Sequence, residues 1–121
     1  MQRLWKALFY SLAGLRDAWR HPACRLEIVA IVLAVPIAIV LPIALYGKLM
    51  LIASNVAIFV VELLNTSIES AIDRIGVERH ELSRIAKDIG SAAVFTTALL
   101  SLVLWIVLAG PSVVNWIFTA G

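Results

Sequence analysis

The sequence predicts an all-α membrane protein, with a surface helix over about residues 3–20 and three membrane-spanning helices over about 26–46, 49–70 and 89–109. Apolar residues make up 62% of the chain and charged residues only 15%, whereas soluble domains average about 45–50% and about 25%. The apolar residues also form long uncharged stretches, such as residues 28–46. A membrane helix needs about 20 such residues. We therefore expect residues 1–121 to form a single membrane domain.

The first predicted element is an amphipathic helix that lies on the membrane surface. Its apolar residues recur at steps of three or four: Leu4, Leu8, Leu12, Leu15 and Trp19. Basic residues lie elsewhere on the helix and interrupt the segment, which argues against a cleaved signal peptide. Helices of this kind lie in the interfacial plane of a bilayer. The pattern fits a simple anchor as well as a substrate-contacting element, and Pro22 ends it.

The basic residues predict the orientation of the three spans. Five of the ten precede span one and four lie between spans two and three, while only Lys48 lies in the first connection. The positive-inside rule therefore places the N-terminus and the second loop in the cytoplasm and the C-terminus outside. We expect a short external turn at residues 46–48, a polar loop over 75–88, and fraying near Gly110-Pro111. The small net charge of +2 gives no reason to expect a nucleic-acid partner.

A stripe of polar residues is the main functional signal in the second span. Its members are separated by 7, 3, 4 and 4 residues, which keeps them on one helix face: Asn55, Glu62, Asn65, Glu69 and Asp73. An acidic residue at the centre of a membrane helix costs about 2.5–3.5 kcal/mol, while each Leu, Ile, Val or Phe contributes only about 0.3–0.6 kcal/mol. Packing by interhelical hydrogen bonds is the simpler interpretation for Asn55. Two buried carboxylates instead predict a functional site that faces a bundle interior or a wet cleft.

The second loop adds phosphate- and metal-binding chemistry close to this stripe. Its charged residues crowd into eleven positions: Glu78, Arg79, His80, Glu81, Arg84, Lys87 and Asp88. Arginine and lysine bind phosphates, and the carboxylates of Glu69, Glu78 and Asp88 are suitable Mg²⁺ ligands together with phosphate oxygens. The sequence has neither a Walker motif nor a kinase glycine-rich loop. Any nucleotide site is therefore expected to be an unconventional one at the membrane surface.

The motifs at these positions resemble those of the prokaryotic diacylglycerol kinases. They read Glu62-Leu-Leu-Asn-Thr-Ser-Ile-Glu69, Asp73-Arg-Ile-Gly76, His80-Glu-Leu-Ser83 and Ala86-Lys-Asp-Ile-Gly-Ser-Ala-Ala93. The resemblance extends from Arg3 to about Trp105. It implies a homotrimer in the bacterial inner membrane, with active sites shared between subunits. It also implies transfer of a phosphoryl group from MgATP to the primary hydroxyl of diacylglycerol.

The resemblance further implies a role for individual residues. Glu62 would be the general base, Asn65 would orient it or the substrate, and Glu69 would bind Mg²⁺. The residues expected to contact the nucleotide are Tyr10, Glu69, Glu78, Arg79, His80, Lys87 and Asp88. Those expected to line the lipid site are Arg3, Arg25, Glu27, Glu62, Ser91 and Trp105.

The sequence departs from the family pattern in one place. The family usually carries a metal-binding acidic residue just after the surface helix, where this chain has His21-Pro22. We therefore name His21, alongside Glu69, as a candidate metal ligand, with Glu27 as another possible substitute. A second ion that binds only weakly is the remaining alternative.

Two other functions fit the same residues. Undecaprenol kinase shares the family and the Glu-Leu-Leu-Asn-Thr core, although the motifs at Asp73 and His80 look more like the diacylglycerol branch. A non-enzymatic oligomeric channel or proton-pathway protein would also place acids in mid-membrane.

Overall fold

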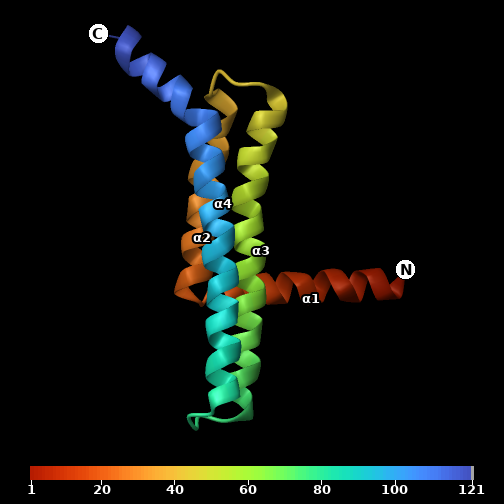
Figure 1. Ribbon diagram of the computed structural model, residues 1–121. Coiled ribbons are helices and arrows are strands. Elements are labelled where there is room, and N and C mark those ends of the chain that lie inside the picture. The colour runs from red at the N-terminus through yellow and green to blue at the C-terminus, as the bar shows by residue number, and fades with distance from the viewer. Residues whose placement is uncertain (121) are drawn as a thin grey trace.

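The structure, a computed structural model, describes residues 1–120 as four helices. They are α1 (Gln2–Ala18), α2 (Pro22–Val40), α3 (Leu45–Ile75) and α4 (Glu81–Thr119). The last three are long and apolar enough to cross a membrane, which confirms the predicted all-α class with three candidate spans. Figure 1 shows α1 extending sideways from the other three, nearly at right angles to them.

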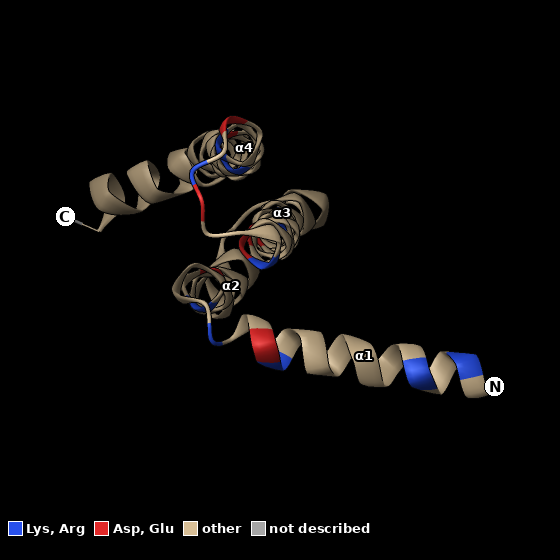
Figure 2. Ribbon diagram, turned by 90° about the horizontal axis from the view of Figure 1, so that it is seen from below, with Lys and Arg blue, Asp and Glu red and all other residues tan. Residues whose placement is uncertain are grey.

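Helices α2, α3 and α4 lie in a row, with α3 in the middle. Figure 2 views the three helices from below, close to end-on, with α3 between α2 and α4, and α3 packs against both of its neighbours. At the end distant from the α3–α4 turn, the small residues Ala38 and Ala109 meet the fully buried Leu51. Small side chains at such positions let membrane helices approach closely. The position of α3 means that residues on its different faces meet α2, α4 or α1.

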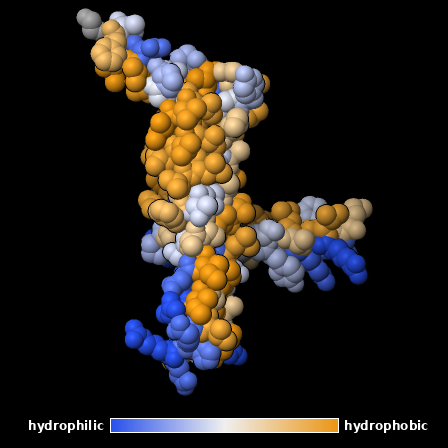
Figure 3. All heavy atoms as spheres, in the orientation of Figure 1, coloured by the Kyte–Doolittle hydropathy of each residue, from blue (hydrophilic) through white to orange (hydrophobic). Residues whose placement is uncertain are grey.

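Both α3 and α4 are longer than a membrane requires. At 1.5 Å per residue their 31 and 39 residues extend about 46 and about 58 Å, whereas the hydrocarbon core is about 30 Å thick. Figure 3 shows an apolar band over the middle of the bundle and hydrophilic side chains at its lower end, where α3 and α4 meet. We call residues 69–88, which form that lower end, the charged end.

The loop predicted over residues 75–88 is shorter in the structure. Helix α3 continues to Ile75 and α4 begins at Glu81, so the connection covers only residues 76–80. The charged residues after 80 form helical ion pairs instead of a loop, because Arg84 contacts Glu81 and Asp88 at three- and four-residue spacing. Hydropathy marks where a helix leaves the hydrocarbon, and it does not mark where the helix ends.

The external turn was also predicted in the wrong place. It covers residues 41–44, and residues 46–48 belong to the first turn of α3. Leu41, the residue before Pro42, has an extended backbone and ends α2, because the ring of a proline disfavours the helical conformation in the residue that precedes it. Lys48 reaches back so that its Nζ donates to the carbonyl of Ile39, one of the last acceptors of α2 that has no helical partner. The predicted fraying of the third span is wrong as well, since α4 continues through Pro111 and its last part bends away from the bundle (Figure 1).

A buried pair of serines joins α3 to α4. The Oγ atoms of Ser54 and Ser101 are 2.8 Å apart. We expect Ser101→Ala to lower the free energy of unfolding by about 0.6 kcal/mol, the average for hydrogen bonds between membrane helices, and by no more than about 1.7 kcal/mol, the largest value for such bonds. Denaturant titration in detergent measures this change. Thr96→Ala is the control because Thr96 is exposed and its hydroxyl donates to Ala92 of its own helix. Equal stability of the two variants would contradict the prediction.

Candidate active site

The polar stripe of α3 runs from the interior of the bundle to the charged end. Asn55, Glu62 and Asn65 are buried, Glu69 is half-buried and Asp73 is exposed. The side chains of Glu62 and Asn65 are each only 7% exposed. The amide of Asn55 donates to the carbonyl of Leu51 in its own helix, which differs from the interhelical hydrogen bond expected of a packing residue. The chemically distinctive part of the stripe is therefore Glu62 to Glu69.

Each of these two carboxylates has a hydrogen-bond donor from its own helix. Thr66 Oγ1 lies 3.4 Å from Glu62 Oε1 and donates to it. Asn65 Nδ2 donates to Glu69 Oε1 at 3.3 Å. The buried Cys24 of α2 places its Sγ 3.4 Å from Thr66 Oγ1, so a polar chain links α2 to Glu62. The sequence analysis missed Thr66, although its position four residues after Glu62 puts it on the same face.

Two more of the predicted site residues, His21 and Glu27, lie near Glu62 at the start of α2. His21 is the N-cap of α2 and Pro22 is its first residue. Both His21 and the half-buried Glu27 lie near enough to Glu62 to interact with it electrostatically. A hollow of about 520 Å³ lies between α1 and α3 here and includes His21 and Thr66 in its wall. Residues of α3 and of the start of α2 therefore lie near the buried carboxylate, and the hollow between α1 and α3 lies beside its partner Thr66.

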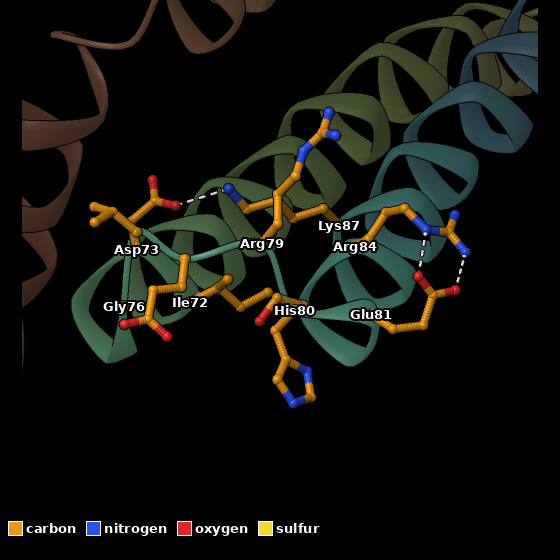
Figure 4. Close-up of a pocket in the computed structure, with 11 residues that line it drawn as sticks. Ile72, Asp73, Gly76, Arg79, His80, Glu81, Arg84 and Lys87 are labelled. Atoms are coloured by element: carbon orange, nitrogen blue, oxygen red, sulfur yellow. Dashed lines mark hydrogen bonds and ion pairs between the residues drawn. The ribbon is translucent and has the colours of Figure 1, made fainter.

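A second hollow, of about 480 Å³, lies at the charged end (Figure 4). Four of the predicted nucleotide-contacting residues line it: Glu78, Arg79, His80 and Lys87. Lys87 Nζ lies 2.7 Å from Asp73 Oδ1 and donates to it. Lys87 is also close enough to Glu69 for an electrostatic interaction between the two charges. Lys87 thus connects this hollow to the end of the α3 stripe.

Ion pairs at the charged end favour the charged forms of Lys87 and Glu81. The hydrogen bond from Lys87 to Asp73 raises the pKa of the lysine, and the hydrogen bonds from Arg84 lower the pKa of Glu81. Arg84 also pairs with Asp88. The ring of His80 points away from the lysine and arginine side chains in Figure 4, and its Nδ1 accepts from the backbone N–H of Leu82.

The remaining five predicted residues line neither of the two hollows. Arg3 is fifteen residues before the end of α1 at Ala18, or about 22 Å along the helix, and Tyr10 is exposed. Arg25 and Ser91 are exposed on α2 and α4. Trp105 packs against the apolar cluster of Ala38, Leu51 and Ala109. The structure of a single chain therefore gives these five residues no place in the walls of either hollow.

The fit of the carboxylates to Mg²⁺ follows from the chemistry of that ion. Within residues 1–120, no three side chains of His, Cys, Asp or Glu converge as a ready-made metal site. Mg²⁺ commonly takes only one or two protein carboxylates and completes its shell with phosphate oxygens and water. Glu69, half-buried and hydrogen-bonded by Asn65, fits that requirement. The imidazole of His21 fits it less well, because Mg²⁺ prefers oxygen ligands.

The sequence is similar to known proteins over almost the whole chain. The sequence matches the prokaryotic diacylglycerol kinase family over residues 9–109. It is 46% identical over 107 residues to the diacylglycerol kinase of Escherichia coli strain K12, covering 88% of each chain. It is 39% identical over 106 residues to the diacylglycerol kinase of Pseudomonas aeruginosa, covering 87% of this chain and 86% of that protein. The diacylglycerol kinase of Haemophilus influenzae is 38% identical over 97 residues, or 79% of this chain and 82% of its own length.

Proposed function

The chain belongs to the prokaryotic diacylglycerol kinase family, and we propose that it transfers the γ-phosphoryl group of MgATP to the primary hydroxyl of diacylglycerol, giving phosphatidate. Membership of a family of lipid kinases decides against the non-enzymatic channel considered above. We further propose that the reaction takes place at the cytoplasmic face of the bacterial inner membrane. The names of the relatives support diacylglycerol as the acceptor.

The pair Glu62 and Glu69 is the observation that carries this proposal. The two carboxylates lie seven residues apart on one face of α3, a separation of about 10 Å along the helix. Glu62 is buried in the bundle, and Glu69 is half-buried at the start of the charged end. A lipid kinase needs this arrangement, because the acceptor hydroxyl comes from the membrane while the phosphates come from water.

Glu62 is proposed as the general base. Its carboxylate would take the proton of the acceptor hydroxyl as the new bond to phosphorus forms. Thr66 occupies Oε1 of this carboxylate and leaves Oε2 for the substrate. Positioned bases of this kind contribute about 10²–10⁴-fold to a rate. Asn65, one turn further along, would orient the base or the substrate.

The charged end is proposed as the nucleotide site. Lys87 and Arg79 would bind the phosphates, and Tyr10, Glu78, His80 and Asp88 would supply further contacts. Glu69 would hold Mg²⁺, with His21 or Glu27 as a possible second ligand, and the bound ion would neutralise charge on the phosphates. Lys87 contacts Asp73 and lies near Glu69, so it is well placed to join the phosphate region to the metal region.

We also propose a homotrimer, with α1 lying on the cytoplasmic membrane surface. Figure 3 supports the second point, because apolar side chains cover the upper side of α1 and hydrophilic ones its lower side. Many large apolar side chains of α2, α3 and α4 are exposed in one chain, and lipid together with neighbouring subunits would cover them. If the sites are shared between subunits, the lipid site would also be lined by four residues that lie outside the hollows of one chain: Arg3, Arg25, Ser91 and Trp105.

The choice of acceptor lipid is tested by a direct comparison. The purified protein in mixed micelles is given MgATP and either diacylglycerol or undecaprenol at matched surface concentration. We expect transfer to diacylglycerol to be the faster reaction by a wide margin. Faster transfer to undecaprenol would instead assign the chain to the alternative acceptor, and absence of transfer to either lipid would overturn the proposed activity.

A further inference from the structure

Gly90 of α4 faces the amide of Asn65 across the α3–α4 interface. The glycine is buried, and a Cβ atom added to it would lie 2.2 Å from Asn65 Oδ1 and 3.3 Å from Asn65 Cγ. Real Cβ atoms essentially never approach another heavy atom within 3.0 Å. The space that a side chain at position 90 would fill is therefore already occupied by the asparagine.

The contact at Gly90 is made by a side chain, and in this it differs from the close packing of two helix backbones. The three atoms nearest to the added Cβ all belong to the side chain of Asn65, and none belongs to the backbone of α3. A glycine that only lets two backbones approach would meet backbone atoms instead. The glycine at this position therefore makes room for one particular side chain.

The Asn65 amide has one side-chain hydrogen bond to direct it. Asn65 is 7% exposed, and its Nδ2 donates to Glu69 Oε1 at 3.3 Å. Its Oδ1 is buried and has no hydrogen-bond partner among residues 1–120. The direction of the amide is thus set by the hydrogen bond to Glu69 on one side and by the shape of the space at Gly90 on the other.

We propose that Gly90 is a positioning residue, whose missing side chain leaves the space that keeps the Asn65 amide directed at Glu69. A methyl group at position 90 would push the amide out of this space, because α4 and α3 are packed together here. The hydrogen bond to Glu69 would then be lost. The catalytic consequence rests on the proposed function, since it requires Asn65 and Glu69 to act in phosphoryl transfer, but the contact itself does not.

Alanine substitutions in two backgrounds test this inference. Gly90→Ala is made in the wild type and in Asn65→Ala, and kcat for lipid phosphorylation and the melting temperature in detergent are measured for each protein. Gly110→Ala is the matched control, because it is the same substitution in the same helix at a position where nothing lies within 4 Å of the added Cβ. Alanine is the better helix former, so helix propensity alone predicts a slightly higher melting temperature for both variants.

We expect Gly90→Ala to lower both the melting temperature and kcat, the latter by about 100-fold, as for a displacement of about 1 Å in an active site. Gly110→Ala should lower neither. In the Asn65→Ala background, Gly90→Ala should cost no stability and no further activity, because the atoms that clash are gone. If Gly90→Ala does not fold alone, recovery of folding in the double variant is the supporting result.

Two results would overturn the inference. One is an equal loss of melting temperature from Gly90→Ala with and without Asn65, which would mean that the glycine serves the backbone. The other is wild-type kcat in Gly90→Ala. A wild-type protein that phosphorylates no lipid would refute the proposed function, while the melting temperatures would still decide whether Gly90 accommodates Asn65.

Discussion

Glu62→Gln is expected to lower kcat for lipid phosphorylation by about 10²–10⁴-fold, the contribution of a general base. Glutamine has nearly the same volume as glutamate and can still accept the hydrogen bond from Thr66, so the fold is expected to survive. It cannot take a proton from the acceptor hydroxyl. Initial rates of ATP-dependent phosphatidate formation measure the effect, and circular dichroism in detergent checks the helical content.

Asn55→Ala is the matched control for this substitution. Asn55 lies on the same face of α3 and is buried like Glu62, but its amide donates to a carbonyl of its own helix. We expect this variant to keep the wild-type kcat. Wild-type activity of Glu62→Gln would remove Glu62 as the base, and equal losses in both variants would mean that the face is needed only for packing.

Glu69→Gln is expected to cause the second large loss, through binding of the metal and the nucleotide. Removing its charge should lower kcat by about 10²–10³-fold, the scale of losing one electrostatic stabiliser of a transition state. It should also weaken Mg²⁺-dependent binding of a non-hydrolysable ATP analogue, measured by calorimetry. The loss of affinity should be accompanied by a higher Mg²⁺ requirement for residual activity.

Comparison of the two variants separates the two proposed roles. Glu62→Gln should bind the Mg²⁺-nucleotide complex as tightly as the wild type, because Glu62 is buried deeper in the bundle than Glu69. Only Glu69→Gln should bind it more weakly. Unchanged binding and an unchanged Mg²⁺ dependence in Glu69→Gln would contradict its role as metal ligand.

The sequence predicted the fold well wherever hydrophobicity alone decides. Three long apolar stretches became three helices, because a membrane span must satisfy its backbone hydrogen bonds within itself. The helix ends were predicted less well. Nothing in the hydropathy of residues 81–88 distinguishes a polar loop from a helix that extends into water. The signal that favours the helix is the spacing of Glu81, Arg84 and Asp88, three and four residues apart, which hydropathy does not detect.

In the candidate site, too, some features could be predicted from the sequence and others could not. Periodicity along α3 placed Glu62, Asn65 and Glu69 on one buried face, since that inference needs only the pitch of a helix. Contacts between helices could not be read from the sequence. The Asp73–Lys87 pair joins residues fourteen positions apart, and the space at Gly90 exists only because α4 meets α3 at Asn65.

Two positions far from the α3 stripe show where the prediction rests on the proposed trimer. Trp105 packs against the apolar cluster that contains Ala38 and Leu51, and Arg3 lies near the free end of α1. Neither position follows from spacing or hydropathy. In the proposed trimer they would contribute to a lipid site with Glu62 from a neighbouring subunit, which a single sequence does not specify.

A structure of the protein with Mg²⁺, a non-hydrolysable ATP analogue and diacylglycerol tests the central claim most directly. We expect the primary hydroxyl of the lipid to lie within hydrogen-bond distance of the Glu62 carboxylate. We also expect Glu69 to contact the metal and the triphosphate to lie between Glu69 and Lys87. A nucleotide bound away from the charged end, or a lipid hydroxyl directed away from Glu62, would contradict the central claim.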